Sequence, residues 1–232
     1  MLLACSFVRI AQQVDAQGES TTLAARLVAR ARPVEFTSPF EAEMAAARAE
    51  LGADLVNLAS GDPDLPTPAH ITAAAVAAIE SGQHHYTPKN GLPELRAAIA
   101  SHLERTIGAR YSADEICATA GVQEALISCF LALTSSGDEV LVPAPTYLSY
   151  QKQTALTGAI CKDVECKAEH DFVVQPADIE KLITPRTKIL VHVSPNNPTG
   201  AVTPPGVVRE IAALAIKHDL VVLSDEIYSD MM

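Results

Sequence analysis

The sequence predicts an α/β fold, in which helices cover both faces of a mainly parallel sheet. Short apolar segments alternate with helical segments from Ile116 onward, and this alternation is typical of β-α-β units. Two of these apolar segments, Ile189–Val193 and Leu220–Leu223, are too short for helices and rich in β-branched residues, as strands buried on both faces are. Both run into polar loops, and open parallel sheets bind ligands at the carboxyl ends of their strands.

The second half of the chain is expected to form the sheet and its covering helices. Glycine, proline and short polar runs separate its segments and set their limits. The expected strands are Ile116–Ala120, Glu139–Val142, Ile160–Glu165, Ile189–Val193 and Leu220–Leu223, and the expected helices are Val122–Thr134, Ala177–Ile183 and Val207–His218.

The first half of the chain is expected to be mainly helical. Residues 1–21 show no strong period, which predicts a loose N-terminal extension. Alanine-rich composition predicts helices after this extension, and a proline suited to a first helical turn predicts where a later helix begins. The expected elements are helices Leu23–Arg32, Phe40–Leu51, Ile71–Glu80 and one from Pro93 to about Gly108, with a short strand at Leu55–Leu58.

Composition argues against several classes of function. The chain has 232 residues, 48% of them hydrophobic, which is enough for one large core. A formal net charge of −11 argues against nucleic acid and against an anionic membrane surface, and no apolar run is long enough to cross a bilayer. The five cysteines form no CxxC pair, and Cys161, Cys166 and His170 have poor spacing for a metal. We therefore expect no metal site, reduced thiols and a cytoplasmic location.

Two motifs carry the functional signal. Ser194–Gly200 reads SPNNPTG and Ser224–Tyr228 reads SDEIY, and each follows an expected buried strand. In this order and spacing they resemble the class I/II aminotransferases, the pyridoxal-phosphate (PLP) enzymes of fold type I in the aspartate aminotransferase superfamily. The loops around Gly61 and Tyr86 also match stretches of that family, so the resemblance runs from about Leu23 to the end of the chain.

The resemblance implies an architecture as well as a family. The chain would form a three-layer αβα large domain that is incomplete at its C-terminal end. Helices and a short strand of the small-domain or arm region would occupy 22–60, and the PLP-binding large domain would occupy 61–232. The resemblance also implies a cis peptide bond between Asn197 and Pro198.

Asp225 is the first candidate for a catalytic residue. A carboxylate at the end of a buried strand is costly unless a partner compensates its charge. The resemblance implies that Asp225 faces the pyridine nitrogen of PLP and keeps it protonated, so that the ring can accept electrons from the substrate. It also implies that Asn197 and Tyr228, the other two catalytic candidates, hydrogen-bond the phenolic oxygen of the ring. Tyr147 matches the aromatic residue that stacks on the ring face.

The phosphate of the cofactor has separate candidates. Gly121, Val122 and Gln123 link a strand to a helix, where the unpaired amides of the first turn favour an anion. The resemblance assigns this turn to the cofactor phosphate. It further implies that Tyr86 reaches the phosphate of a neighbouring subunit, which predicts a homodimer, and that the backbone of Gly61 contacts the substrate carboxylate.

Histidine is a further residue type that often serves as an acid or base. His84 and His85 lie in a polar loop, and His192 lies within an apolar strand. None of them matches a catalytic role in the family. We expect His192 to be a hydrogen-bonded core histidine.

The sequence departs from the family after Tyr228. The family uses a downstream lysine to form a Schiff base with PLP, and arginines to bind the phosphate and the substrate α-carboxylate. All seven lysines of this chain lie at or before Lys217, and the sequence ends at Met232. We therefore expect an incomplete copy, truncated before the Schiff-base lysine, that cannot transaminate alone.

The expected function is that of a PLP-dependent aminotransferase, which transfers an amino group between an amino acid and a 2-oxo acid. Two alternatives stay open. One is a different PLP reaction on the same scaffold, such as that of a carbon–sulfur lyase. The other is a non-catalytic PLP-binding module or pseudoenzyme.

Overall fold

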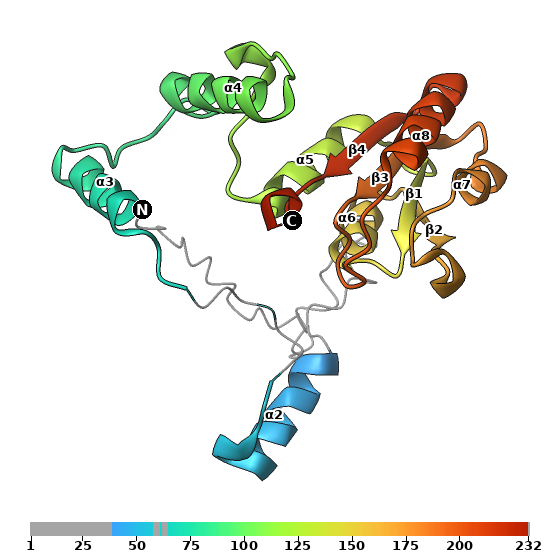
Figure 1. Cartoon of the computed structure of the whole chain (residues 1–232), viewed down its shortest axis with the longest axis horizontal. Coiled ribbons are helices and arrows are strands. Elements are labelled where there is room, and N and C mark those ends of the chain that lie inside the picture. Colours follow the sequence, from blue (N-terminus) through green and yellow to red (C-terminus); the bar gives the residue numbers. More distant parts are fainter. Residues whose placement is uncertain (1–38, 58–60, 62–64, 232) are drawn as a thin grey trace, which may run out of the picture. The chain divides into compact units, whose positions relative to one another are not determined.

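The structure, a computed structural model, describes residues 39–57, 61 and 65–231. These residues fall into two compact units that divide between Ala118 and Thr119 (Figure 1). The expected extension at 1–21 and the expected helix Leu23–Arg32 lie outside the described residues. The domain limits implied by the resemblance stay a prediction. None of the described helices is both long and apolar enough to cross a membrane.

The described part of the first unit is helical, as predicted. Its last long helix shows how the sequence sets the limits: a proline stands in the first turn, and Gly108 ends the helix in the left-handed conformation with φ +70°. A side chain at that φ would be strained, which is why glycine suits the position. The helices are α2 (Pro39–Leu51), α3 (Ala69–Glu80) and α4 (Pro93–Ile107), with 3₁₀ turns at Gly52–Asp54 and Ala113–Glu115.

Two predicted strands are wrong as far as the structure describes them. Residues 55–57 form no strand, and neither does Ile116–Ala120. The second segment has extended backbone at Ile116, and Ala118 donates its N–H to the Asn90 carbonyl at 3.0 Å. A strand exists only as part of a ladder, and no described strand lies beside this segment. The apolar composition of this segment therefore did not suffice to predict a strand, although Ile116 has extended backbone.

The second unit contains a four-stranded parallel sheet, as predicted. Its strands are β1 (Glu139–Ala144), β2 (Ile160–Glu165), β3 (Thr187–Val193) and β4 (Val221–Asp225). They are arranged in the order β2-β1-β3-β4, and all three pairings are parallel. The predicted strands from Glu139 onward are thus confirmed, with ends that agree within two residues.

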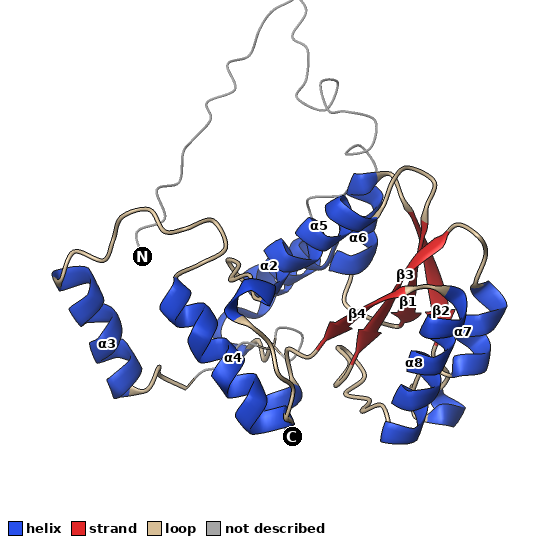
Figure 2. Cartoon of the chain, turned by 90° about the horizontal axis from the view of Figure 1, so that it is seen from above, coloured by secondary structure: helices blue, strands red, loops and turns tan. Residues whose placement is uncertain are grey.

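Helices cover both faces of this sheet, which gives three layers (Figure 2). The α5/α6 side buries Val140 and Val142 of β1, and the α7/α8 side buries Leu141, as the alternation along a strand requires. The helices are α5 (Val122–Leu133), α6 (Ser149–Thr157), α7 (Pro176–Leu182) and α8 (Pro205–His218), with 3₁₀ turns at Ala168–His170 and Ser229–Met231.

Helix α6 is the one element of this unit that the sequence analysis missed. It is polar and short, so it shows no apolar period. A signal was nevertheless present, because β1 and β2 are parallel and successive parallel strands need a crossover, which is usually a helix. Gly158 ends α6 with φ +81°.

The order of the strands creates a switch point between β1 and β3. From β1 the chain crosses to β2 on one side, then returns past β1 to β3 and continues to β4. In open parallel sheets, the crevice outside the carboxyl ends of the two central strands at such a reversal is the usual ligand site. The loops that follow β1 and β3 are therefore the part of this fold where a site is expected.

Candidate active site

Asn196 joins the two loops at the switch point. Its side-chain Nδ2 donates to the Pro145 carbonyl at 3.0 Å and to Thr199 Oγ1 at 2.8 Å, and its Oδ1 accepts from the Thr146 hydroxyl at 3.3 Å. The residue is only 7% exposed. Because one buried side chain bonds to both loops, it holds the loops after β1 and β3 at a fixed separation.

Asn197 and Tyr228, two of the residues predicted from the motifs, lie side by side. The Asn197 Nδ2 donates to the phenolic oxygen of Tyr228 at 3.2 Å. Their loops meet because β3 and β4 are neighbours, with Val193 in register with Asp225. The amide keeps a second N–H and the phenol keeps its own hydrogen, so the pair can offer two donors to one oxygen atom. The Asn197–Pro198 peptide bond is cis, as expected, and so are Ala144–Pro145 and Ser194–Pro195.

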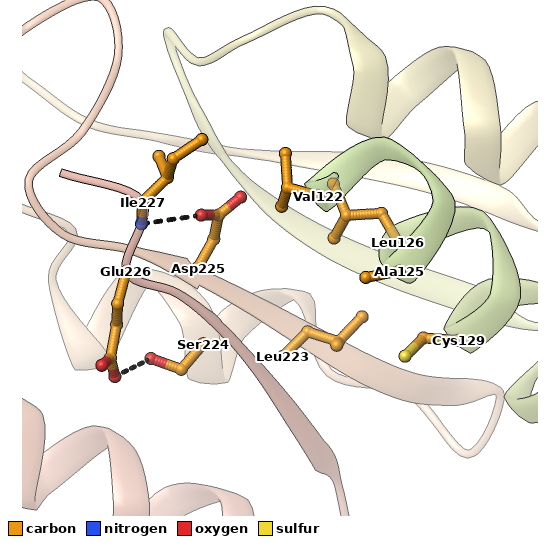
Figure 3. Close-up of a pocket in the computed structure, with 9 residues that line it drawn as sticks. All are labelled: Val122, Ala125, Leu126, Cys129, Leu223, Ser224, Asp225, Glu226 and Ile227. Carbon is orange, nitrogen blue, oxygen red and sulfur yellow. Dashed lines mark hydrogen bonds between the residues drawn. The ribbon is translucent and has the colours of Figure 1, made fainter. Parts of the chain in front are cut away.

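Asp225, the third predicted catalytic residue, is the last residue of β4 and is 8% exposed. Its Oδ2 accepts a hydrogen bond from the Tyr150 hydroxyl at 2.6 Å, and its Oδ1 accepts from the Ile227 N–H at 3.2 Å (Figure 3). No ion pair between described residues involves Asp225. Within the part of the chain that the structure describes, the carboxylate is therefore held by neutral donors alone.

Tyr150 was not predicted from the sequence. It lies in the first turn of α6 and is 3% exposed. Burial raises the pKa of its phenol, and the hydrogen bond to Asp225 and the charge of that carboxylate raise it further, with smaller effects from Tyr228 and Tyr147. The hydroxyl therefore stays protonated and donates at any physiological pH.

The predicted phosphate turn begins α5. Gly121 precedes the helix with φ +87°, and the space beside its Cα is open to 4 Å. Both the carbonyl and the side chain of Gln123 accept hydrogen bonds from the Gln153 amide, at 3.3 and 2.7 Å, which ties this turn to α6. The Ala120 N–H donates to the Glu124 carboxylate, so one amide next to the turn already has an anionic partner.

The remaining predicted residues are less constrained. Tyr147 lies in the loop after β1 and is about half exposed, three residues before Tyr150. Tyr86 and Gly61 belong to the first unit, where Tyr86 is fully exposed and the space beside Gly61 is open. The roles of these three residues stay predictions.

A pocket of about 340 Å³ adjoins Asp225 on the α5 side of β4 (Figure 3). Figure 3 shows the Asp225 and Leu223 side chains on the side that faces α5, whereas Ser224 and Glu226 point away. The lining is mainly apolar and consists of Val122, Ala125, Leu126, Cys129, Leu223, Ser224, Asp225, Glu226 and Ile227. Of the predicted site residues, only Val122 and Asp225 line it.

The expectation for His192 is wrong in one respect. Its Nε2 is buried and has no hydrogen-bond partner among the described residues. Burial lowers the pKa of this imidazole, and the charge of Glu226 opposes that shift. The imidazole lies in β3 opposite Ser224, whose hydroxyl donates to Glu226 at 2.8 Å instead. His192 is thus a neutral, partly buried side chain without the predicted hydrogen bond at Nε2.

Sequence analysis missed Tyr150 and Asn196 because their partners are distant along the chain. Tyr150 is 75 residues from Asp225, and Asn196 is 51 residues from Pro145. A signal for Asn196 was present in the SPNNPTG motif, where it directly precedes Asn197. No comparable signal marks Tyr150, whose partner depends on how α6 packs on the sheet.

This parallel sheet, with its covering helices and its polar loops at the switch point, is that of the large domain of fold type I transferases. The family model described as aminotransferase class I and II matches residues 53–232. The chain therefore belongs to the class I and II aminotransferase family.

Its relatives are named as aminotransferases of several substrates. The chain is 42% identical over 181 residues to the aspartate/prephenate aminotransferase of Thermus thermophilus, covering 78% of this chain and 47% of that protein. It is 36% identical over 225 residues to an aspartate aminotransferase of Streptomyces avermitilis, covering 97% of this chain and 51% of that protein.

Solved structures of aminotransferases also match this chain. The aspartate aminotransferase of Thermus thermophilus with maleate matches with a TM-score of 0.81 and 39% identity, covering 86% of this chain and 52% of that one. An alanine aminotransferase from Pyrococcus furiosus matches with a TM-score of 0.83 and 36% identity, covering 88% of this chain and 52% of that one. The chain spans about half the length of the relatives it matches.

Proposed function

We propose that this chain forms the cofactor-binding part of a PLP-dependent aminotransferase, which transfers an amino group between an amino acid and a 2-oxo acid. The observation that carries the proposal is the buried Asp225 carboxylate at the end of β4, which has no cationic partner among the described residues and lies next to the hydrogen-bonded pair of Asn197 and Tyr228. Membership of the aminotransferase family supports the same function.

The residues present fit the chemistry of the cofactor. PLP supplies an electron sink when its pyridine nitrogen is protonated. A buried carboxylate with spare lone pairs suits a ring N–H, and an amide beside a phenol suits an anionic ring oxygen. The open space beside Gly121 and the first-turn amides of α5 suit a phosphate.

Each residue then has a specific task. Asp225 holds the proton at the ring nitrogen, and Asn197 and Tyr228 bind the phenolic oxygen. Tyr147 stacks on the ring face, and Gly121, Val122 and Gln123 bind the phosphate.

Two residues of the first unit complete the proposal. The backbone of Gly61 binds the substrate carboxylate. Tyr86 reaches the phosphate in a second subunit of a homodimer, and its full exposure in the described unit is consistent with such a contact. The free thiols of Cys117, Cys129, Cys161 and Cys166 are consistent with a cytoplasmic protein.

The substrates are proposed only as a class. The printed names of the relatives include aspartate, aspartate/prephenate and alanine aminotransferases. Because these names differ at similar identity to this chain, they support an amino acid and a 2-oxo acid as substrates but favour no particular pair.

The test is binding of pyridoxamine phosphate to the 232-residue chain. This form of the cofactor carries an amine in place of the aldehyde, so it forms no imine with a lysine and reports the non-covalent site alone. Binding is followed by calorimetry for the unmodified chain and for Asp225→Ala. We expect Asp225→Ala to weaken binding roughly 10- to 100-fold, the value of a hydrogen bond to a charged group.

Asp163→Ala is the matched control, because it removes a carboxylate from β2 at the opposite edge of the sheet. It is expected to bind as the unmodified chain does. Absence of binding to the unmodified chain, or equal binding by the two variants, would show that the proposed function is wrong.

A further inference from the structure

The hydrogen bond between Tyr150 and Asp225 links two buried side chains from different elements. It is short, at 2.6 Å, and both residues are buried, at 3% and 8% exposed. It joins α6 to the end of β4, which are separated by 75 positions in the sequence. A buried carboxylate normally requires a cation or several donors. Here the hydrogen-bond donors to the carboxylate are one phenol and one backbone amide.

The carboxylate nevertheless retains capacity for a further partner. Its two oxygens offer about four lone-pair sites. Tyr150 uses one of them on Oδ2, and the Ile227 N–H uses one on Oδ1. With these two donors in place, both the position of the carboxylate and the direction of its free lone pairs are defined.

Helix α6 also connects this carboxylate to the loop after β1. Tyr147 stands in that loop and Tyr150 in the first turn of the helix, three positions later. Asn196 fixes the same loop through Pro145 and Thr146. A movement of this segment would therefore reach both Tyr147 and Asp225.

We propose that Tyr150 is a positioning residue, which holds the Asp225 carboxylate aimed at the ring nitrogen of the cofactor. This inference rests on the proposed function. Tyr150 itself touches neither substrate nor cofactor in this role. It donates to Asp225 on the side away from the ligand and stays protonated while doing so.

The proposal predicts a specific effect of Tyr150→Phe. The substitution removes one oxygen atom and keeps the buried ring, so the packing of α6 is preserved. The carboxylate loses the side-chain donor that fixes its orientation. We expect the affinity for pyridoxamine phosphate to fall roughly tenfold at neutral pH.

Thr154→Val is the matched control. Thr154 lies one turn later on α6, is fully buried, and its hydroxyl has no partner among the described residues. This variant also removes one buried hydroxyl from α6, but not one that bonds to Asp225. We expect it to leave the affinity unchanged.

A double-mutant cycle tests whether Tyr150 acts through Asp225. Affinities are measured for Tyr150→Phe, Asp225→Ala and the double variant. Tyr150→Phe is expected to have no further effect once Asp225 is gone. In the unliganded chain, a low-field NMR resonance from the hydrogen-bonded Tyr150 hydroxyl is expected and should disappear in each single variant. Replacing Tyr150 with 3-fluorotyrosine, which keeps the hydroxyl, should retain the affinity of the unmodified chain.

The outcomes separate the two proposals. If the unmodified chain binds and Asp225→Ala does not, but Tyr150→Phe behaves like the unmodified chain, the positioning role is wrong and the proposed function stands. Equal losses in Tyr150→Phe and Thr154→Val, or a Tyr150→Phe effect that persists without Asp225, also overturn the positioning role. If the unmodified chain does not bind, the proposed function fails and the cofactor role of Tyr150 fails with it. The hydroxyl resonance would then report only on the pair itself.

Discussion

Two buried carboxylates lie at opposite ends of the same parallel sheet, and they are held in different ways. Glu139 is the first residue of β1 and is fully buried, whereas Asp225 is the last residue of β4 and is 8% exposed. In a parallel sheet the amino ends of all strands lie on one side and their carboxyl ends lie on the other. The comparison is therefore between the amino-end side and the carboxyl-end side of one sheet.

Glu139 is surrounded by cations and hydroxyls. Burial by itself would raise its pKa, but its donors outweigh burial and hold the pKa at about 2. The partners are Lys162 at 2.8 Å, Arg186 at 3.0 Å, Thr184 at 2.6 Å and Thr187 at 3.1 Å. They come from β2, β3 and the turn before β3, so this one side chain ties three neighbouring segments together.

The difference shows how one sheet can separate stability from function. At the amino ends of the strands, two cations and two hydroxyls bind the Glu139 carboxylate, which leaves it little capacity for a ligand. At the carboxyl ends of the strands, two neutral donors bind Asp225, and its carboxylate oxygens keep free lone pairs. Buried acids of the second kind are the ones expected at sites that bind a charged partner.

The largest expected effect comes from Glu139→Gln. It leaves Lys162 and Arg186 without their buried partner, but both cations reach solvent, with side chains 28% and 66% exposed. We therefore expect a cost at the lower end of that for a buried ion pair, about 3 kcal/mol. Urea unfolding of the chain measures this loss. Glu180→Gln is the control, because Glu180 pairs with Lys217 at 2.6 Å on the surface, where such pairs contribute about 1 kcal/mol or less.

The same acid predicts a pH dependence. The Glu139 pKa is lowered from 4.5 to about 2, so its contribution to stability is complete above about pH 4.5 and is lost as the pH falls through about 2. The unmodified chain should lose stability across that window, and Glu139→Gln should lose less of its remaining stability there. Identical acid limbs in the two proteins would contradict the network as described.

Asp225→Asn is expected to lower cofactor affinity while leaving stability nearly unchanged, in contrast to Glu139→Gln. It keeps an acceptor for Tyr150 and removes a buried charge that has no cation, so the free energy of unfolding should change by less than about 1 kcal/mol. Its affinity for pyridoxamine phosphate should fall roughly 10- to 100-fold. A large loss of stability with unchanged affinity would make Asp225 a structural residue like Glu139.

Asn196→Ala should fall between these two extremes. It removes the bonds that join the loops after β1 and β3, with an expected loss of about 1–3 kcal/mol in stability. Because Asn197 and Tyr147 lie in those loops, affinity for pyridoxamine phosphate should fall as well, by roughly tenfold. Thermal unfolding and calorimetry measure the two effects. If stability falls while affinity is unchanged, the two loops do not position the site.

The smallest effect is expected from His192→Leu. The substitution removes a buried nitrogen that has no partner among the described residues, so it should raise stability by up to about 1 kcal/mol. The His192 pKa is lowered below 6.5, which means that the unfolded chain binds its proton more readily as the pH falls below that value. The unmodified chain should therefore lose more stability than His192→Leu between neutral and mildly acidic pH. Urea unfolding at several pH values measures the difference.

Much of the fold could be predicted because its signals are local. The apolar run of Ile189–Val193, the proline in the first turn of α4 and Gly108 after that helix each act over a few residues. The failures have a common cause as well. Ile116–Ala120 is apolar but lacks a described neighbour to pair with, and α6 has no apolar period although the topology requires it.

In the candidate site, too, local motifs could be predicted and contacts between distant segments could not. Asn197, Asp225 and Tyr228 could be named from two motifs, and their meeting followed from the parallel order of β3 and β4. Tyr150 could not be named, because nothing in the residues around it indicates a partner 75 positions away.

The sequence by itself therefore determined most of the segments that form helices and strands, and which loops carry polar side chains, because periodicity and chain-breaking residues act locally. Only the tertiary structure decided which buried groups become partners. Strand order set β1 beside β3, which allowed Asn196 to bridge their loops. The packing of α6 on the sheet turned Tyr150 toward Asp225. Such pairings depend on the positions of whole elements, which no short stretch of sequence specifies.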